Sequence, residues 1–115
     1  MHETFVAQSL LTQIESLAKE QNARPVTAKI SCGELNTVND EVLSFAFDAI
    51  AKGTICEGMK LTIEHKSLLA KCKSCNENSE ITFDNPRCSK CGSDALEILP
   101  DAPLMLEQVE FYTEQ

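Results

Sequence analysis

Four cysteines stand in two Cys-x-x-Cys pairs, Cys72 with Cys75 and Cys88 with Cys91, and twelve residues separate the pairs. Two residues between paired cysteines let both sulfurs turn toward one ion, and a second such pair completes a tetrahedron. Gly92 follows the second pair directly, where a tight turn favours a residue without a side chain. Because four protein ligands leave no open coordination position, the spacing predicts structural zinc and not catalytic zinc.

Two other uses of the same cysteines remain open from the spacing alone. Soft thiolates also suit iron in a site of the rubredoxin type, and paired thiols serve in redox chemistry. The surrounding residues 67–100 hold few large apolar side chains. A segment this small and polar cannot bury enough surface to fold unaided, so a metal should supply much of its folding free energy.

The chain has 115 residues and a net charge of −8, which suits one ordinary domain or two very small ones. This charge disfavours nucleic acid, which attracts proteins mainly through Lys and Arg contacts to phosphate. Five basic and three acidic residues give residues 66–92 a net charge of +2, which leaves −10 for the remainder. A zinc ion bound by four thiolates is formally −2, so a locally basic shell complements it.

The first twenty residues have no basic start, and polar residues interrupt their apolar pattern. A secretory signal is therefore not expected, and no apolar run approaches the length of a membrane span. We expect the protein in the cytoplasm, where cysteines more often stay thiols or metal ligands than form disulfides.

Hydrophobic periodicity predicts a helix at 4–22, a strand at 26–32, a helix at 41–52, a strand at 59–65 and a strand at 104–112. The sequence thus indicates an α+β fold in which two helices cover a small three-stranded sheet, with a zinc-ribbon-like module inserted before the last strand. Domains are expected at 1–66 with 101–115 and at 67–100. Asn39 or Asp40 should cap the second helix, and Gly53 should end it.

The same periodicity predicts which side chains face the core. The expected apolar positions are Ala7, Leu10, Leu11, Ile14, Leu17 and Ala18 in the first helix; Leu43, Phe47 and Ile50, widened by Val42, Phe45 and Ala46, in the second; Met59, Leu61 and Ile63 in the second strand; and Met105, Val109 and Phe111 in the last. His65 falls on the same side of the second strand, where a position at the sheet edge is expected. Cys32 and Cys56 are expected to be small, buried hydrophobic residues. Glu34 and Asp40 read as solvated or capping residues.

The chain begins Met1-His2-Glu3, and His2 is too large to permit removal of the methionine. The terminal amine, the His2 amide nitrogen and the His2 ring can close fused chelate rings on one ion, and the Glu3 amide could supply a fourth nitrogen. A square-planar nitrogen set suits Ni(II) or Cu(II). The first N–H groups of a helix lack intrahelical acceptors, so deprotonating these amides would break no helical bond. A terminus that is merely solvated remains the ordinary alternative, as does a plain strand role for His65.

An ordered set of short motifs resembles the HypA/HybF family of hydrogenase maturation proteins over essentially the whole chain. These motifs are Met1-His2-Glu3, Ala7-Gln8-Ser9-Leu10, Gly33-Glu34-Leu35, Phe45-Ala46-Phe47, Gly53-Thr54 and the two cysteine pairs. One departure is Asn39-Asp40-Glu41, which stands where the family often places proline at the start of the second helix; Asp40 can begin a helix without it.

The resemblance implies a nickel metallochaperone that delivers Ni(II) to the large subunit of [NiFe]-hydrogenase, works with a HypB-type GTPase, and in some organisms also serves urease. Carried over residue by residue, Met1, His2 and Glu3 would bind nickel, and Cys72, Cys75, Cys88 and Cys91 would bind structural zinc. A homodimer is compatible with this role.

Two other functions compete with that of a nickel carrier. A zinc-ribbon module for protein interaction fits the cysteine motif equally well, although a nucleic-acid ribbon would need a basic stripe and stacking aromatics. An enzyme is disfavoured because the chain has two histidines, no Ser/His/Asp set and no open metal position.

Overall fold

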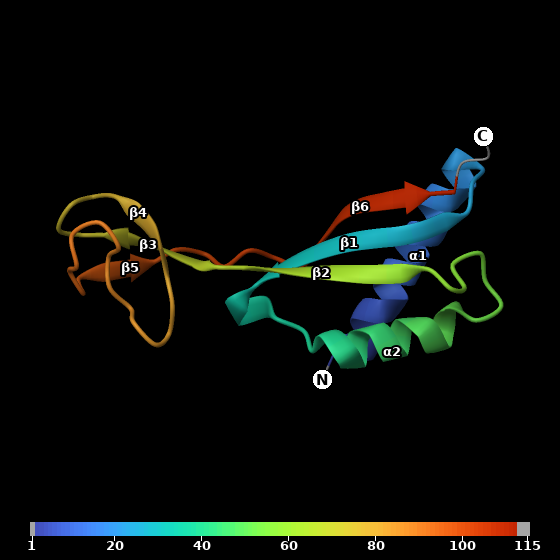
Figure 1. The fold of residues 1–115 in the computed structure, drawn as a ribbon, viewed down its shortest axis with the longest axis horizontal. Coiled ribbons are helices and arrows are strands. Elements are labelled where there is room, and N and C mark those ends of the chain that lie inside the picture. Colours follow the sequence, from blue (N-terminus) through green and yellow to red (C-terminus); the bar gives the residue numbers. More distant parts are fainter. Residues whose placement is uncertain (1, 113–115) are drawn as a thin grey trace. The chain divides into compact units, whose positions relative to one another are not determined.

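The computed structural model describes residues 2–112. Two helices and six strands follow one another along the chain (Figure 1): α1 (Glu3–Gln21), β1 (Pro25–Gly33), α2 (Asp40–Ala51), β2 (Lys60–Lys66), β3 (Leu68–Cys72), β4 (Asn78–Ile81), β5 (Leu96–Ile98) and β6 (Met105–Phe111). A 3₁₀ turn at Glu34–Asn36 follows β1. No helix in the described part of the chain is long and apolar enough to span a membrane.

The described residues divide into two compact units. The first unit contains residues 2–31, 38–64 and 105–112, and the second contains residues 32–37 and 65–104. The assignment of nickel to the first unit and of zinc to the second stays a prediction.

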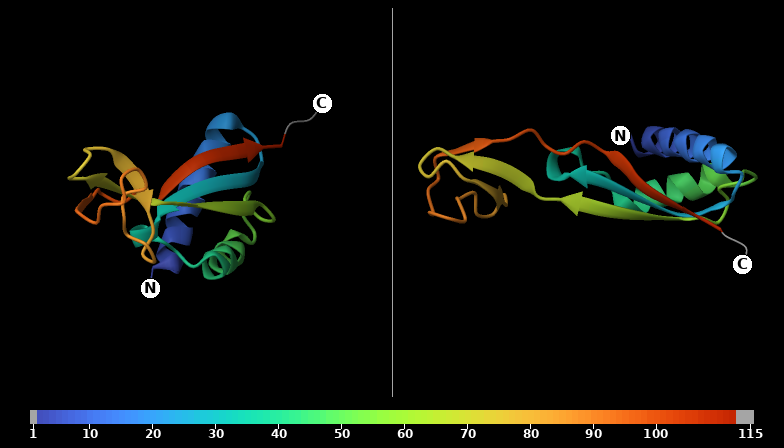
Figure 2. Two further views of the ribbon diagram at one scale, coloured as in Figure 1. Left: turned by 60° about the vertical axis from the view of Figure 1, so that its left-hand side comes forward. Right: turned by 90° about the horizontal axis from the view of Figure 1, so that it is seen from above.

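The first unit is a three-stranded sheet of order β2-β1-β6, and β1 and β6 run antiparallel. Helices α1 and α2 pack on each other, and α1 lies behind the sheet in Figure 1 and apart from it in the view from above in Figure 2. The buried apolar side chains include Ala7, Leu10, Ile14 and Ala18 of α1, Ala28 and Ile30 of β1, and Leu43, Phe47 and Ala51 of α2. The predicted α+β architecture with two helices and a three-stranded sheet is therefore confirmed.

The ends of α2 follow from local chemistry. Asn39 is the N-cap, and its side-chain oxygen accepts the N–H of Val42 at 2.9 Å, which satisfies one of the helix's unpaired donors. Helical hydrogen bonding ends after Ala51, and Gly53 adopts a φ of +80°, which a residue with a side chain adopts only with strain. Both expected signals at these ends are confirmed.

Three predictions of buried side chains are wrong. Phe45 is 76% exposed because it lies on the outer side of α2, away from Leu43 and Phe47, and Val42 in the first turn of the same helix is 42% exposed. Met105 is 51% exposed, and its neighbour Leu106 is half-buried instead. The pairing of β1 with β6 explains this shift. Lys29 lies opposite Gln108 and Ile30 opposite Leu106, so Glu107 is an extra residue that reverses the alternation of β6.

His65 lies in β2, as the strand role predicts, and it is exposed although it continues the alternation of that strand. Met59 is buried and Leu61 and Ile63 are half-buried, so the apolar face of the strand ends before His65. The division into units places His65 in the second unit, whereas residues up to Glu64 belong to the first.

The second unit contains another three-stranded sheet, of order β4-β3-β5, in which both neighbouring pairs run antiparallel. Its small apolar cluster consists of Leu68, Ala70 and Ile81, with the half-buried Leu96 packed against it. The return segment after β5 is held by Asp101, whose Oδ2 accepts the N–H groups of Leu35 and Asn36 at 2.8 Å each. Gly33 lies against the same carboxylate so closely that a Cβ atom there would overlap it.

Candidate functional site

Cys72, Cys75, Cys88 and Cys91 converge in the second unit, and their sulfur atoms all lie within 4.8 Å of one another. The closest pairs are Cys72 with Cys91 at 3.5 Å and Cys75 with Cys88 at 3.7 Å. A tetrahedral zinc ion with Zn–S bonds of about 2.3 Å requires sulfur atoms roughly 3.8 Å apart. The four sulfurs therefore fit a tetrahedral metal, and the chemistry of four thiolates favours zinc.

The two cysteine pairs are built by the same backbone turn. In the first turn the N–H of Asn76 donates to the carbonyl of Cys72 at 2.9 Å, and in the second the N–H of Gly92 donates to that of Cys88 at 2.9 Å. Both residues have positive φ, 64° at Asn76 and 79° at Gly92. This turn brings the two sulfurs of each pair together, and β3, which ends at Cys72, anchors the first turn in the sheet.

Backbone N–H groups also point at the sulfurs. The N–H of Cys75 lies 3.4 Å from the Cys72 sulfur, and that of Lys90 lies 3.4 Å from the Cys88 sulfur. Before a metal binds, the N–H groups of Cys91 and Lys90 lower the pKa of Cys88 to about 6. The N–H groups of Cys75 and Ser74 likewise lower the pKa of Cys72. Both shifts favour the thiolate, which is the form that binds a metal.

The pKa values of the other two thiols move the opposite way. The N–H of Ser93 lowers the pKa of Cys91, but the nearby sulfurs, Cys72 first, outweigh it and raise that pKa to about 12. In each turn one thiol therefore has a lowered pKa and its partner a raised pKa, as expected when like charges share a small site. A divalent cation removes this conflict and displaces the remaining protons.

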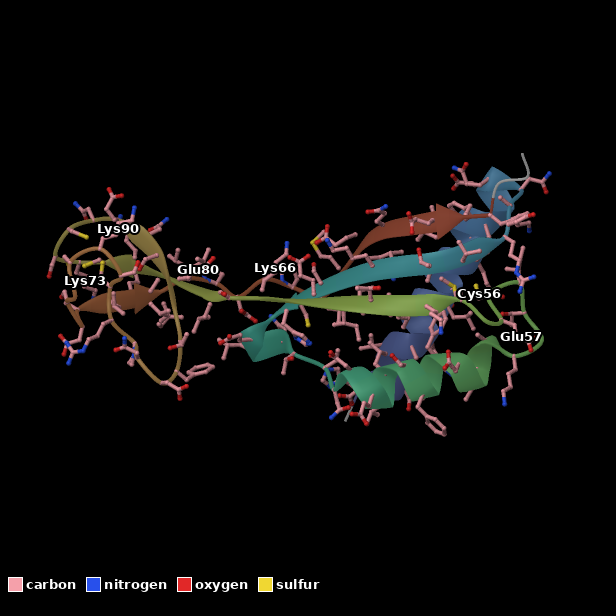
Figure 3. The ribbon with its side chains drawn as sticks, viewed as in Figure 1. Cys56, Glu57, Lys66, Lys73, Glu80 and Lys90 are labelled. Atoms are coloured by element: carbon pink, nitrogen blue, oxygen red, sulfur yellow. The ribbon has the colours of Figure 1, made fainter. Side chains whose placement is uncertain are left out.

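The basic side chains near the four cysteines are placed as the charge pattern predicts. Lys73 and Lys90 lie beside the group of sulfur atoms in Figure 3. The ammonium of Lys90 also lies 3.2 Å from a carboxylate oxygen of Glu77, which joins the two turns by an ion pair. Both side chains are more than half exposed, so this pair contributes little to stability.

The other predicted site lies at the head of α1. Met1 lies outside the described residues. His2 is exposed and occupies the N-cap position, but its side chain makes no capping hydrogen bond. The first intrahelical bond runs from the N–H of Val6 to the carbonyl of His2 at 2.8 Å. The N–H of Glu3 precedes that bond and has no intrahelical acceptor.

Glu3 differs from its neighbour because its side chain turns inward and is only 5% exposed. Its Oε2 accepts the N–H of Asn39 at 2.9 Å, which joins the start of α1 to the N-cap of α2. The Asn39 N–H is the main cause that lowers the pKa of the Glu3 carboxyl, against the opposing effect of burial, and the backbone N–H of Glu3, the charge of His2 and the His2 N–H add to it. The other oxygen, Oε1, is buried with no hydrogen-bond partner among the described residues.

The sequence contained a signal for this buried carboxylate that helical periodicity alone did not use. Glu3 stands four residues before Ala7 and seven before Leu10, so it falls on the buried stripe of α1. A charged residue on such a stripe is buried only with a partner. The role of Asp101 had no comparable signal, because the residues that it holds lie more than sixty positions away.

Comparison with known proteins agrees with this architecture. Residues 1–111 match the family model described as HypA, hydrogenase/urease nickel incorporation, metallochaperone. The hydrogenase maturation factor HypA of Aquifex aeolicus is 38% identical over 96% of both chains, and that of Salmonella typhimurium is 37% identical over 96% of this chain and 95% of its own. The solution structure of the Ni metallochaperone HypA from Helicobacter pylori superimposes with a TM-score of 0.63 at 25% identity, covering 99% of this chain and all of that one.

The match extends over both units, from the N-terminal residues through the four cysteines to β6. The architecture, the cysteine cluster and the similarity over nearly full length lead to one conclusion: this chain belongs to the HypA family of hydrogenase maturation factors.

Proposed function

We propose that this protein is a nickel metallochaperone that binds Ni(II) at its N-terminus and releases it for maturation of [NiFe]-hydrogenase. The nickel ligands are the terminal amine of Met1, the amide nitrogen and ring of His2, and the amide nitrogen of Glu3. Cys72, Cys75, Cys88 and Cys91 hold a separate structural zinc ion. The partners are a HypB-type GTPase and the hydrogenase large subunit, the site of action is the cytoplasm, and the protein carries the ion without acting as an enzyme.

The observation that supports the nickel site most directly is the exposure of the His2 ring at the start of α1. Its ring is exposed and caps nothing, and the following amide has no intrahelical acceptor. A metal can therefore replace the protons on these nitrogens without loss of helical hydrogen bonds. Family membership makes nickel the expected ion.

Because the Glu3 side chain turns inward, its carboxylate and its backbone amide have different roles. The carboxylate is held by the Asn39 N–H inside the first unit, so it is not available as a surface ligand. The backbone amide of the same residue remains at the helix head. Glu3 therefore contributes to the proposed site in two ways, by its amide nitrogen and by fixing the start of α1 against α2.

A carrier also has to release its ion. A shallow site made from an exposed chain end gives the acceptor direct access, and transfer proceeds only as far as the difference in affinity allows. Acid should oppose nickel binding, because protons compete for the amine, the ring and the amides.

Calorimetric titration of Ni(II) into the zinc-loaded protein tests the proposal. We expect one nickel per chain, and we expect His2→Ala and a one-residue extension before Met1 each to abolish it with zinc retained. A one-residue extension at the C-terminus is the matched control and should bind as the unmodified protein does.

Equal binding in all four proteins would remove nickel from the N-terminus. The remaining function would then be that of a zinc-ribbon interaction module, which blocking the terminal amine does not affect. Loss of zinc on nickel loading would contradict the assignment of zinc as structural.

A further inference from the structure

A second group of potential metal ligands lies in the second unit, away from the four cysteines in sequence. It consists of Cys32 near the end of β1, Thr37 just after the 3₁₀ turn and His65 near the end of β2. The Nδ1 atom of His65 lies 3.7 Å from the Cys32 sulfur and 3.2 Å from the Thr37 hydroxyl oxygen. We call these three residues the Cys32 cluster.

Hydrogen bonding alone does not account well for this arrangement. A neutral imidazole nitrogen offers either one proton or one lone pair. The Nδ1 atom of His65 can therefore make one good hydrogen bond, yet two polar atoms from separate segments converge on it. A cation bound by the sulfur, the hydroxyl oxygen and the ring nitrogen is a second use that the same three side chains could serve.

The distances between these atoms fit a tetrahedral ion better than a planar one. With zinc–sulfur and zinc–nitrogen bonds of about 2.3 and 2.05 Å, a tetrahedral angle places the two ligand atoms roughly 3.6 Å apart, and a right angle places them roughly 3.1 Å apart. The observed separation of Cys32 Sγ and His65 Nδ1 is 3.7 Å. A tetrahedral oxygen–nitrogen pair would be roughly 3.4 Å apart, near the 3.2 Å between Thr37 and His65.

The three residues of the Cys32 cluster differ in their exposure to solvent. Cys32 is completely buried, whereas Thr37 and His65 are exposed. Cys56, the other cysteine outside the two pairs, is equally buried in the first unit. The backbone N–H of Cys56 donates to the Thr54 hydroxyl, and its carbonyl accepts the N–H of Met59. None of the hydrogen bonds described for Cys56 involves a histidine.

We propose that Cys32, Thr37 and His65 bind one exchangeable divalent ion of the zinc class, with the fourth coordination position open to solvent. The thiol proton of Cys32 leaves to solvent as the metal–sulfur bond forms. A neutral hydroxyl is a poorer ligand than a thiolate, so this site binds more weakly than the four cysteines. It uses none of the residues assigned to nickel or to structural zinc.

Cobalt(II) is a suitable probe because thiolate ligation and tetrahedral geometry both give it strong absorption bands. The experiment uses the full chain with zinc bound at the four cysteines and one residue added before Met1, which blocks the N-terminal site. We expect one Co(II) per chain, with a thiolate-to-cobalt charge-transfer band and without zinc release.

The variants separate ligands from bystanders. Cys32→Ser should remove the charge-transfer band, and His65→Gln should weaken Co(II) binding by at least about tenfold. Cys56→Ser makes the same change at an equally buried thiol and should leave the spectrum and affinity unchanged. His65 is exposed, so His65→Gln should fold normally and decides the result even if Cys32→Ser does not fold.

Two results would overturn the proposal. One is Co(II) binding that His65→Gln leaves at the level of the Cys56→Ser protein. The other is a charge-transfer band that grows only in proportion to released zinc, because this would mean exchange at the four cysteines. Neither result bears on nickel, since the N-terminal site is blocked throughout.

Discussion

Glu3 shows how one side chain can connect a chain terminus to the core. Its carboxylate is buried and accepts the N–H of Asn39, and its other oxygen has no hydrogen-bond partner between residues 2 and 112. A buried carboxylate is tolerated where a hydrogen bond and a helix N-terminus stabilise its charge. The head of α1 is therefore fixed against α2, and the exposed His2 stands at a defined place.

The lowered pKa of Glu3 makes this link dependent on pH. A carboxyl whose pKa is lower in the folded protein contributes stability above its unfolded pKa, and that contribution is lost as the pH falls through its folded pKa. Glu3→Gln should therefore lower the melting temperature at neutral pH, and the deficit should shrink below about pH 4, the range of an ordinary carboxyl. Melts followed by the helical circular dichroism signal would measure this. Glu41→Gln, at an exposed position of α2, is the control; a Glu3→Gln deficit that stays constant with pH would contradict the account.

The N-cap of α2 provides a second test on a single residue. Asn39→Ala removes the acceptor for the Val42 N–H and should cost about 1 kcal/mol of unfolding free energy. Asn39→Asp keeps an oxygen at the same place and should cost less. Urea unfolding monitored by helix content would compare the two, and equal losses would show that the cap is not the cause.

At the scale of elements, the two cysteine turns depend on residues with positive φ. No atom lies within 4 Å of the position that a Cβ would take at Gly92, so a substitution there acts only through the backbone. Gly92→Ala should cost about 1–2 kcal/mol and weaken zinc retention against a competing chelator by about tenfold. Asn76→Gly, which relieves the same strain in the first turn, should retain zinc at least as well. Weaker retention in both variants would refute this explanation.

The sequence predicted both helices and three strands to within about two residues, because each has a regular apolar period. It did not predict β3, β4 and β5, whose buried residues are few and whose backbone follows the turns around the cysteines. It also misplaced Met105, since a bulge at Glu107 changes which face a side chain takes without leaving a mark on composition. At the candidate sites, local spacing foretold the four-cysteine cluster. Contacts such as Glu3 to Asn39 and His65 to Cys32 join distant segments and depend on the completed fold.

At the scale of the whole molecule, the two units are stabilised by different means. The first has an extensive apolar core contributed by both helices, β1 and the segment that leads into β2, whereas the apolar cluster of the second contains three buried side chains. Small units of the second kind usually need a metal to fold. Their responses to perturbation should therefore be separable.

Removing zinc with a chelator should unfold the second unit and leave the first folded. Amide hydrogen exchange would show this as lost protection at Ala70 in β3 and retained protection at Ile30 in β1. Phe47→Ala is the opposite perturbation, because Phe47 is completely buried in the first unit. It should lower that unit's unfolding free energy by about 3–5 kcal/mol and leave zinc affinity unchanged. Simultaneous loss of protection in both units after chelation would mean that they fold as one.

The repeated turn around the cysteines also has a kinetic consequence. Each turn is closed by its own short hydrogen bonds, Asn76 to Cys72 and Gly92 to Cys88, so either can form before the other. Zinc can then bind first to the two sulfurs of one turn, and the two sulfurs of the other turn complete its coordination afterwards. Twelve residues separate the two pairs, and a loop of roughly that length closes in about 10–100 ns. Closure is so fast that the supply of zinc, and not the motion of the chain, should set the rate at which the newly made module matures.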